Sequence, residues 1–168
     1  RDTDRSRGLG DVYKRQIYNS AMVRAGANGK PEFCPRAAGH PRTAIGWPVT
    51  PESMEWGTRF VWERYGLPIY ITENGISCTD SIHLDGKVHD PARIDFIHRY
   101  LLSLRRAIDS GVDVRGYFHW SLLDNFEWSE GYNERFGLIY LDYATGKRTP
   151  KDSAAWYAKV AETNGKNL

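Results

Sequence analysis

The residue best placed to do chemistry is Glu73, which follows the short run Ile69–Thr72 and precedes an Asn-Gly pair. A β-branched and aromatic run that starts after a proline and stops at Asn-Gly is typical of a buried strand. The C-terminal end of a parallel strand is where α/β sheets and barrels place their reacting groups. Glu73 is therefore a candidate reacting carboxylate, although its position alone equally fits an ordinary solvated loop acid.

A second apolar run, Gly116–Trp120, opens into a segment that carries Glu127 and Trp128. A carboxylate shared between two adjacent hydroxyl groups makes a strong, geometry-specific contact, and flat rings pack against the C–H faces of a sugar. Taken singly, Trp120 and Phe136 fit core packing equally well, and Glu127 fits a rim acid. The residues by themselves leave both interpretations open.

The two stretches together resemble the signature segments of the family 1 glycoside hydrolases, the β-glucosidase family. The resemblance runs from about Gly46 to Tyr157 and includes Glu134–Leu138 and Lys147–Ser153. It implies an α/β fold, a partial (β/α)8 TIM barrel made of the last two to three βα units. Ile69–Thr72 and Val112–Trp120 would be the seventh and eighth barrel strands.

The resemblance also implies a retaining O-glycoside hydrolase that acts on unphosphorylated β-glycosides through a covalent glycosyl-enzyme. Glu73 would be the nucleophile. The residues implied in substrate binding are Trp120 as a stacking floor, Glu127 as an acceptor from remote hydroxyls, Trp128 as an indole donor, Phe136 packed nearby, and Tyr18, which would hold the nucleophile. Glu127 argues against phosphorylated sugars, because a carboxylate repels a phosphate.

The catalytic acid of the family lies in an Asn-Glu-Pro segment on the fourth strand, and that tripeptide does not occur here. The pair Asn133-Glu134 lacks the proline and resembles a late loop, so we expect Glu134 to pair with an arginine at the surface. The prediction is therefore a truncated hydrolase that is weakly active or inactive. The alternative is a non-catalytic remnant that binds carbohydrate.

Composition limits these interpretations. A chain of 168 residues is shorter than the roughly 250 of a complete barrel. The net charge of +2 gives no nucleic-acid footprint, and no apolar run reaches membrane-spanning length. The partner that the resemblance implies is a small-molecule glycoside. The histidines lack metal-ligand spacing and no cofactor is implied; His119 is expected to be a hydrogen-bonded core residue. Cys34 and Cys78 are interpreted as free thiols, which favours a cytoplasmic location.

Three helices are predicted where a capping residue precedes a proline. They run from Thr50-Pro51 to about Tyr65, from Asp90-Pro91 to Gly111, and from Thr149-Pro150 to near Gly165. Leu138–Tyr143 is predicted to form a small hairpin arm, and Asn19–Gly46 a long rim loop.

The first segment, residues 1–16, alternates in charge without apolar periodicity and is predicted to be a disordered or non-native leader; residues 17–168 are predicted to be the barrel portion. An incomplete barrel leaves strand edges exposed, so we also expect self-association.

Overall fold

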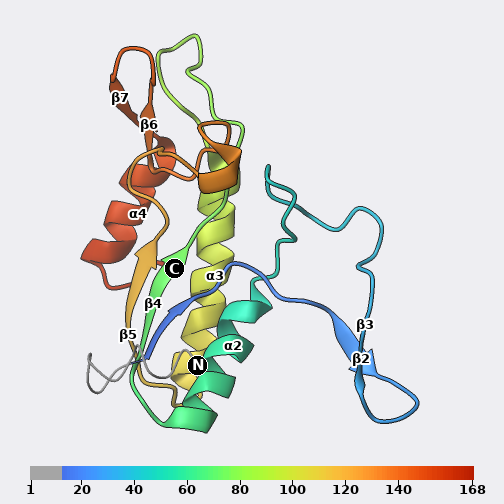
Figure 1. Cartoon of the computed structure of the whole chain (residues 1–168). Helices are drawn as coiled ribbons and strands as arrows, with labels where there is room; N and C mark the ends of the chain where they lie inside the picture. The colour runs from blue at the N-terminus through green and yellow to red at the C-terminus, as the bar shows by residue number, and fades with distance from the viewer. Residues whose placement is uncertain (1–12) are drawn as a thin grey trace.

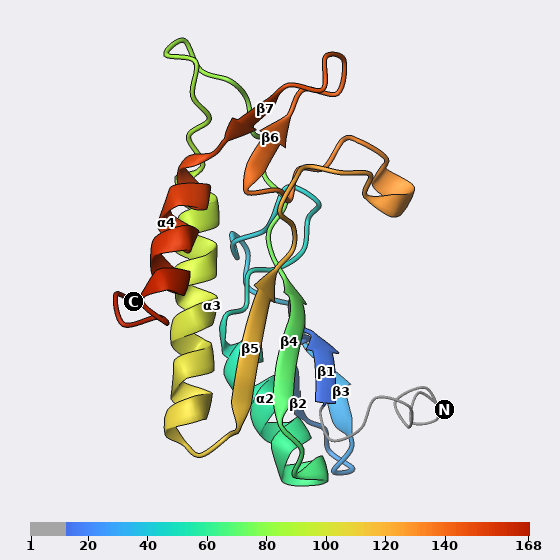
Figure 2. The same cartoon turned by 90° about the vertical axis from the view of Figure 1, so that its left-hand side faces the viewer.

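A computed structural model describes residues 13–168 of the chain. Its centre is a parallel sheet of three strands, β1 (Tyr13–Gln16), β4 (Ile69–Asn74) and β5 (Val114–His119), in the order β1-β4-β5. Figures 1 and 2 show the strands side by side with β4 in the middle. The predicted βα units of a partial barrel are confirmed, and within the described residues the sheet is open.

Helices cover one face of this sheet. They are α2 (Glu52–Tyr65), α3 (Pro91–Asp109) and α4 (Asp152–Glu162). Successive strand side chains point to opposite faces, and Ile69 and Ile71 of β4 point toward the helices, where both are fully buried. The core they join is built mainly from α3, with Phe96, Ile97, Tyr100, Leu101, Leu104 and Ala107.

The two predicted strands are confirmed, with ends that differ by two residues or fewer. The ends of the helices are less well predicted. Helix α2 ends at Gly66 as expected, in the left-handed conformation with φ of 61°. Thr50 does not cap α2 with its side chain; its hydroxyl oxygen instead accepts from the Ser20 amide at 3.0 Å.

Helix α4 begins later than predicted. Thr149 and Pro150 belong to strand β7 (Arg148–Pro150), which pairs antiparallel with β6 (Ile139–Leu141). Proline is tolerated there because β7 has β6 on one side only within residues 13–168. The pair lies at the top of Figure 1 and confirms the predicted hairpin arm, with Pro150 in it rather than in the helix.

Part of the predicted leader is ordered, and the boundary between leader and barrel at residues 16 and 17 stays a prediction. Residues 13–16 form β1, with Tyr13 opposite Ile69 of β4. Strand β1 could not be predicted from the sequence because three of its four side chains are exposed, which leaves no apolar pattern. The strand is defined by its backbone hydrogen bonds to β4. Residues 1–12 lie outside the described residues, and for them the leader remains a prediction.

The stretch Asn19–Gly46 is not structureless. It contains a short antiparallel hairpin of β2 (Val23–Ala25) and β3 (Pro31–Phe33), which projects away from the sheet in Figure 1. In residues 13–168, none of the helices combines the length and apolar character needed to cross a membrane.

Candidate functional site

Glu73 is the next-to-last residue of β4, which ends two residues later than the predicted end at Thr72, and it is partly buried. Tyr18 lies just after the end of the neighbouring strand β1. Its hydroxyl donates a hydrogen bond of 3.0 Å to Oε2 of Glu73. Burial, and then the charge of Glu73, raise the pKa of Tyr18 well above its ordinary value, so the phenol stays protonated and keeps its donor.

Asn74 fixes the position of Glu73 across all three strands. Its side chain is fully buried, and Nδ2 donates to the carbonyl of Ile17 at 2.7 Å. On the other side the Tyr117 hydroxyl of β5 donates to Oδ1 of Asn74 at 2.7 Å. Both polar atoms of the amide are thus satisfied, which holds β1, β4 and β5 in register beside the carboxylate.

Gly75 allows the end of β4 to approach the end of β5. A Cβ atom at this position would lie 1.9 Å from the backbone oxygen of Trp120. The Trp120 amide donates to the carbonyl of Asn74 at 2.8 Å, and the peptide bond between Trp120 and Ser121 is cis. The sequence indicates Gly75 only as a strand terminator, whereas the structure requires it for this close contact.

Trp120 and Glu127 form the second half of the site. The indole Nε1 of Trp120 donates to Oε1 of Glu127 at 2.9 Å, and Glu127 is 9% exposed. Burial raises the pKa of Glu127, the Trp120 hydrogen bond opposes this, and the negative charge of Glu73 raises the pKa further. The charge of Glu73 acts on Glu127, so the two carboxylates lie in the same region, and a substrate space shared between them stays a prediction.

Aromatic rings enclose the same space. Phe136 is buried and packs edge-on against Tyr18, with ring centroids 6.5 Å apart. Trp47 contacts both rings, at 5.3 Å from Tyr18 and 6.2 Å from Phe136. Trp47 is not among the predicted site residues. Its only sequence signal is an aromatic residue between a glycine and a proline, directly before the α2 segment.

Trp128 differs from the other predicted residues. It begins the short 3-10 turn η1 (Trp128–Glu130), has φ of 48°, and is 78% exposed. Its ring is therefore largely in solvent, and its predicted contact with substrate stays a prediction.

Glu134 is placed differently from its expected surface pairing with an arginine. The residue is partly buried, and its Oε2 atom is buried without a hydrogen-bond partner among the described residues. The charge of Glu134 also raises the pKa of Glu127, so the two carboxylates lie in the same region. The Nε2–H group of His119 donates to the Phe136 carbonyl at 3.2 Å, which agrees with its predicted structural role.

A buried chain of alternating charges fixes the loop that carries Glu127. The chain runs through Asp90, Arg93, Asp80, Lys151, Asp124 and Arg135. Lys151 bonds to Asp80 at 2.6 Å and to Asp124 at 2.8 Å, and the side chains of both partners are almost fully buried. Asp124 also accepts from the Gly137 amide at 2.9 Å. Three acids and three bases neutralise one another, which is how buried charges become tolerable.

Asp90 accepts hydrogen bonds at the beginning of α4, a role that was not predicted from the sequence. It precedes α3 as predicted but does not cap that helix with its side chain. Its carboxylate accepts instead from the amide and hydroxyl of Ser153, at 2.9 and 2.6 Å, at the beginning of α4. The network therefore ties two helix starts to the loops above the sheet.

This arrangement defines a class of protein: a parallel α/β sheet with carboxylates and edge-packed aromatic rings near the C-terminal ends of its strands. The sequence model described as Glycosyl hydrolase family 1 matches residues 11–166, and the chain belongs to this family. That match includes β1.

Several relatives are β-glucosidases or related enzymes. Beta-glucosidase A of Thermotoga maritima is 50% identical over 126 residues, which are 74% of this chain and 28% of the relative. A 1,4-beta-D-glucan glucohydrolase of Thermotoga neapolitana is 45% identical over 156 residues, 92% of this chain and 35% of the relative. A 6-phospho-beta-galactosidase of Leptotrichia buccalis is 46% identical over 125 residues, 73% and 27% of the two chains.

Among solved structures, the Thermotoga maritima β-glucosidase in complex with glucoimidazole superposes with a TM-score of 0.84 at 44% identity. The alignment covers 92% of this chain and 35% of that one. The chain thus spans about a third of the length of these relatives.

Proposed function

We propose that the protein is a retaining β-glucosidase-type hydrolase in which Glu73 is the nucleophile. The observation that carries the proposal is the position of Glu73: it lies near the strand end, accepts a hydrogen bond from Tyr18, and lies in the same region as Glu127, which is hydrogen-bonded to Trp120. Each of these groups suits a role in sugar cleavage.

In the first step of this mechanism the Glu73 carboxylate attacks the anomeric carbon, and the bond from that carbon to the aglycone oxygen breaks. An acid protonates the departing oxygen. Water then attacks the glycosyl-enzyme, gives its proton to the same acid group, now a base, and releases Glu73 and the sugar. Tyr18 stabilises the ionised Glu73 through its hydrogen bond in the resting state.

Glu127 and Trp120 bind the hydroxyls and the C–H face of the sugar. Oε1 of Glu127 already accepts from Trp120, so Oε2 is the oxygen left to accept from substrate hydroxyls. Glu134 adds a second carboxylate in the same region. Two negative charges there disfavour a phosphate group on the sugar, so we assign unphosphorylated β-glycosides, although some relatives are 6-phospho-β-galactosidases.

The second candidate, a non-catalytic carbohydrate-binding remnant, is favoured by one specific observation. The chain contains no Asn-Glu-Pro segment to provide the acid. Retention requires a second carboxyl group about 5 to 5.5 Å from the nucleophile. For the chain alone we therefore expect little or no hydrolysis of an aryl β-glucoside.

The test restores a whole barrel by joining residues 13–166 to the Thermotoga maritima enzyme in place of its matching segment. We call this fusion protein the chimera. We expect it to hydrolyse an aryl β-glucoside, and we expect Glu73→Ala to abolish turnover. Azide should then restore the variant and yield the α-glycosyl azide, because the small anion replaces the nucleophile from the same side.

A chimera that is folded yet inactive, or a Glu73→Ala variant with unchanged turnover, would refute the assignment. Glu52→Ala is the matched control, since this acid lies on α2 and should leave activity unchanged. Preference for a 6-phosphorylated aryl glucoside over the unphosphorylated one would refute the assigned substrate class while leaving Glu73 as nucleophile.

A further inference from the structure

Tyr100 of α3 makes two hydrogen bonds through its hydroxyl group, and both reach outside its own helix. The residue is completely buried, and its ring stacks on Phe96 with the ring centroids 4.0 Å apart. Tyr100 is not among the predicted site residues. A buried phenol needs partners for its hydroxyl group, so these two bonds show what the residue connects to the core.

The two hydrogen bonds have a fixed direction. The Thr50 amide donates to the Tyr100 hydroxyl oxygen at 2.9 Å, and this hydroxyl donates to the Tyr18 carbonyl oxygen at 2.9 Å. A phenol has a single proton and an amide N–H can only donate, so the proton of Tyr100 points to Tyr18. Burial raises the pKa of Tyr100 above its ordinary value, so the hydroxyl keeps this proton.

The backbone that carries Tyr18 is held by side chains from two other elements. One residue earlier, the Ile17 carbonyl accepts from Asn74 of β4 at 2.7 Å. In the part of the chain that the structure describes, the Tyr18 carbonyl accepts from Tyr100 and from no other group. Helix α3 thus holds the backbone of the residue whose side chain bonds to Glu73.

The hydrogen bond between Tyr18 and Glu73 leaves little room for movement. The Tyr18 hydroxyl lies 3.0 Å from Oε2 of Glu73. A separation beyond about 3.5 Å is no longer a hydrogen bond, so a displacement of about 0.5 Å breaks it. The Tyr18 ring meets Trp47 and Phe136 edge-on. Edge-on pairs occur over a wide range of centroid separations, about 4.5 to 7 Å, and tolerate such a shift.

We propose that Tyr100 is a positioning residue for the reaction, because its bond to the Tyr18 carbonyl holds the Tyr18 hydroxyl against Glu73. The inference rests on the proposed function, in which Glu73 is the nucleophile. Tyr100 acts through Tyr18 and not through contact with substrate, since it is completely buried. A residue that only supported the core would lower stability without acting on the site through Tyr18.

The test is a double-mutant cycle in the chimera that combines Tyr100→Phe with Tyr18→Phe. Tyr100→Phe removes the hydroxyl and keeps the ring that stacks on Phe96. We expect kcat/KM for an aryl β-glucoside to fall about tenfold in Tyr100→Phe, and less than about twofold when the same change is made in the Tyr18→Phe background. An equal loss in both backgrounds, or an unchanged kcat/KM in Tyr100→Phe, would overturn the proposal.

Phe96→Leu is a second variant that keeps the Tyr100 hydroxyl and removes the ring on which Tyr100 stacks. It takes the place of Tyr100→Phe in the cycle if that variant does not fold. We expect a smaller loss of kcat/KM that likewise disappears in the Tyr18→Phe background. A loss that persists there would count against the proposal.

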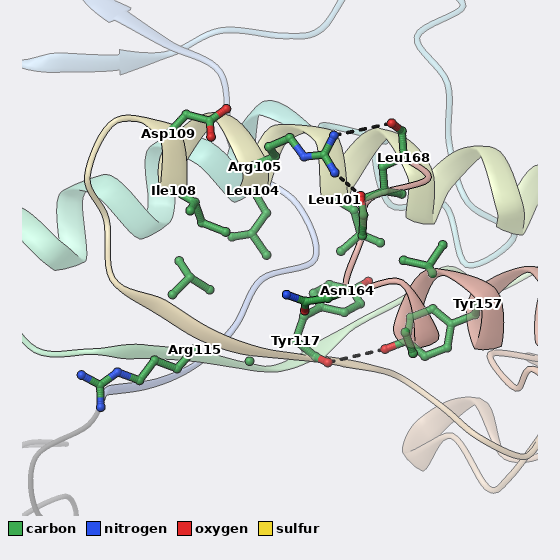
Figure 3. Close-up of a pocket in the computed structure, with 15 residues that line it drawn as sticks. Leu101, Leu104, Arg105, Ile108, Asp109, Arg115, Tyr117, Tyr157, Asn164 and Leu168 are labelled. Atoms are coloured by element: carbon green, nitrogen blue, oxygen red, sulfur yellow. Dashed lines mark hydrogen bonds between the residues drawn. The ribbon is translucent and has the colours of Figure 1, made fainter.

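Tyr157→Phe is the matched control. Figure 3 shows the Tyr157 hydroxyl directed to the Tyr117 carbonyl in a pocket of about 590 Å³ between α3, α4 and β5, with the two oxygen atoms 3.5 Å apart. The change removes the same atom from a helical tyrosine that bonds to a different strand. We expect kcat/KM to stay unchanged. A loss as large as in Tyr100→Phe would show that the effect is not specific to Tyr18 and would overturn the proposal.

A crystal structure of the Tyr100→Phe chimera gives a readout that does not depend on turnover. We expect the Tyr18 hydroxyl to lie more than about 3.5 Å from Oε2 of Glu73. An unchanged separation of 3.0 Å would refute the positioning role.

These readouts separate the positioning role from the proposed function. A folded chimera without turnover refutes the function, and the distance between Tyr18 and Glu73 then decides the role of Tyr100. A chimera that requires Glu73 but shows equal losses in the two backgrounds refutes the role of Tyr100 and leaves Glu73 as the nucleophile.

Discussion

Replacing Gly75 with alanine in the chimera tests how closely the ends of β4 and β5 must approach. The added Cβ would lie 1.9 Å from the Trp120 backbone oxygen and 3.0 Å from the Trp120 carbonyl carbon. Because Cβ contacts below 3.0 Å are essentially never seen, the oxygen and the Cβ must separate by at least about 1.1 Å. The two contacted atoms of Trp120 both belong to its backbone, so rotation of a side chain cannot relieve the clash.

This shift would move Glu73 away from Trp120 and Glu127. Glu73 lies two residues before Gly75 on β4, whereas Trp120 and the Glu127 bonded to it lie on the far side of the contact. A displacement of about 1 Å between reacting groups costs roughly 100-fold in rate, or about 2.7 kcal/mol of transition-state stabilisation. We therefore expect kcat/KM for an aryl β-glucoside to fall by about 100-fold in Gly75→Ala.

Gly66→Ala is the control for a glycine substitution away from the site. Gly66 ends α2 with φ of 61°, and a Cβ there would meet no atom within 4 Å. The left-handed conformation costs an alanine about 1 to 2 kcal/mol, so Tm should fall while kcat/KM stays unchanged. A folded Gly75→Ala chimera with kcat/KM within about threefold of the parent would refute the close-approach argument.

Three further predictions concern the chimera. Asp124→Ala leaves Lys151 with one fewer buried acid, and chemical denaturation should show a loss of about 3 kcal/mol or more; a loss below about 1 kcal/mol would contradict the network's role. Tyr18→Phe removes the donor to Glu73, so kcat/KM should fall about 10- to 100-fold, and an unchanged value would show that the hydroxyl is dispensable. Burial lowers the pKa of His119 from 6.5 to about 3 in the folded protein. Below pH 6.5 the unfolded state therefore binds a proton that the folded state does not, so the free energy of unfolding decreases as the pH is lowered. Between pH 8 and 5 this costs about 2 kcal/mol in the parent, and His119→Gln should lose that part of the pH dependence.

The sequence predicted the elements that are defined by buried apolar periodicity. Ile69–Thr72 and the α3 segment are such elements, because burial requires both the residue types and their spacing. Glu73 was predicted as a reacting group from its place at a strand end, whereas the resemblance assigned Trp120 and Glu127 to the same site. The resemblance then brought in Tyr18, whose contact with Glu73 the structure confirms.

Features that depend on partners distant in the sequence could not be predicted. Strand β1 owes its conformation to β4, more than 50 positions later, and its own residues are mostly polar. Pro150 has the local pattern of a helix start, but pairing with Ile139 keeps it extended. Asp90 likewise has the local pattern of a cap for α3, yet its carboxylate bonds to Ser153.

The chain of buried charges has a consequence for sequence variation. The three carboxylates and three cations of this network neutralise one another while almost completely buried. Loss of any one member therefore leaves a buried charge that has neither a partner nor water to stabilise it. Drift at one position should thus be accompanied by a compensating change at its neighbour. An alignment of relatives should show Lys151 and Asp124 kept or replaced as a pair, and independent replacement would indicate that water reaches this interior.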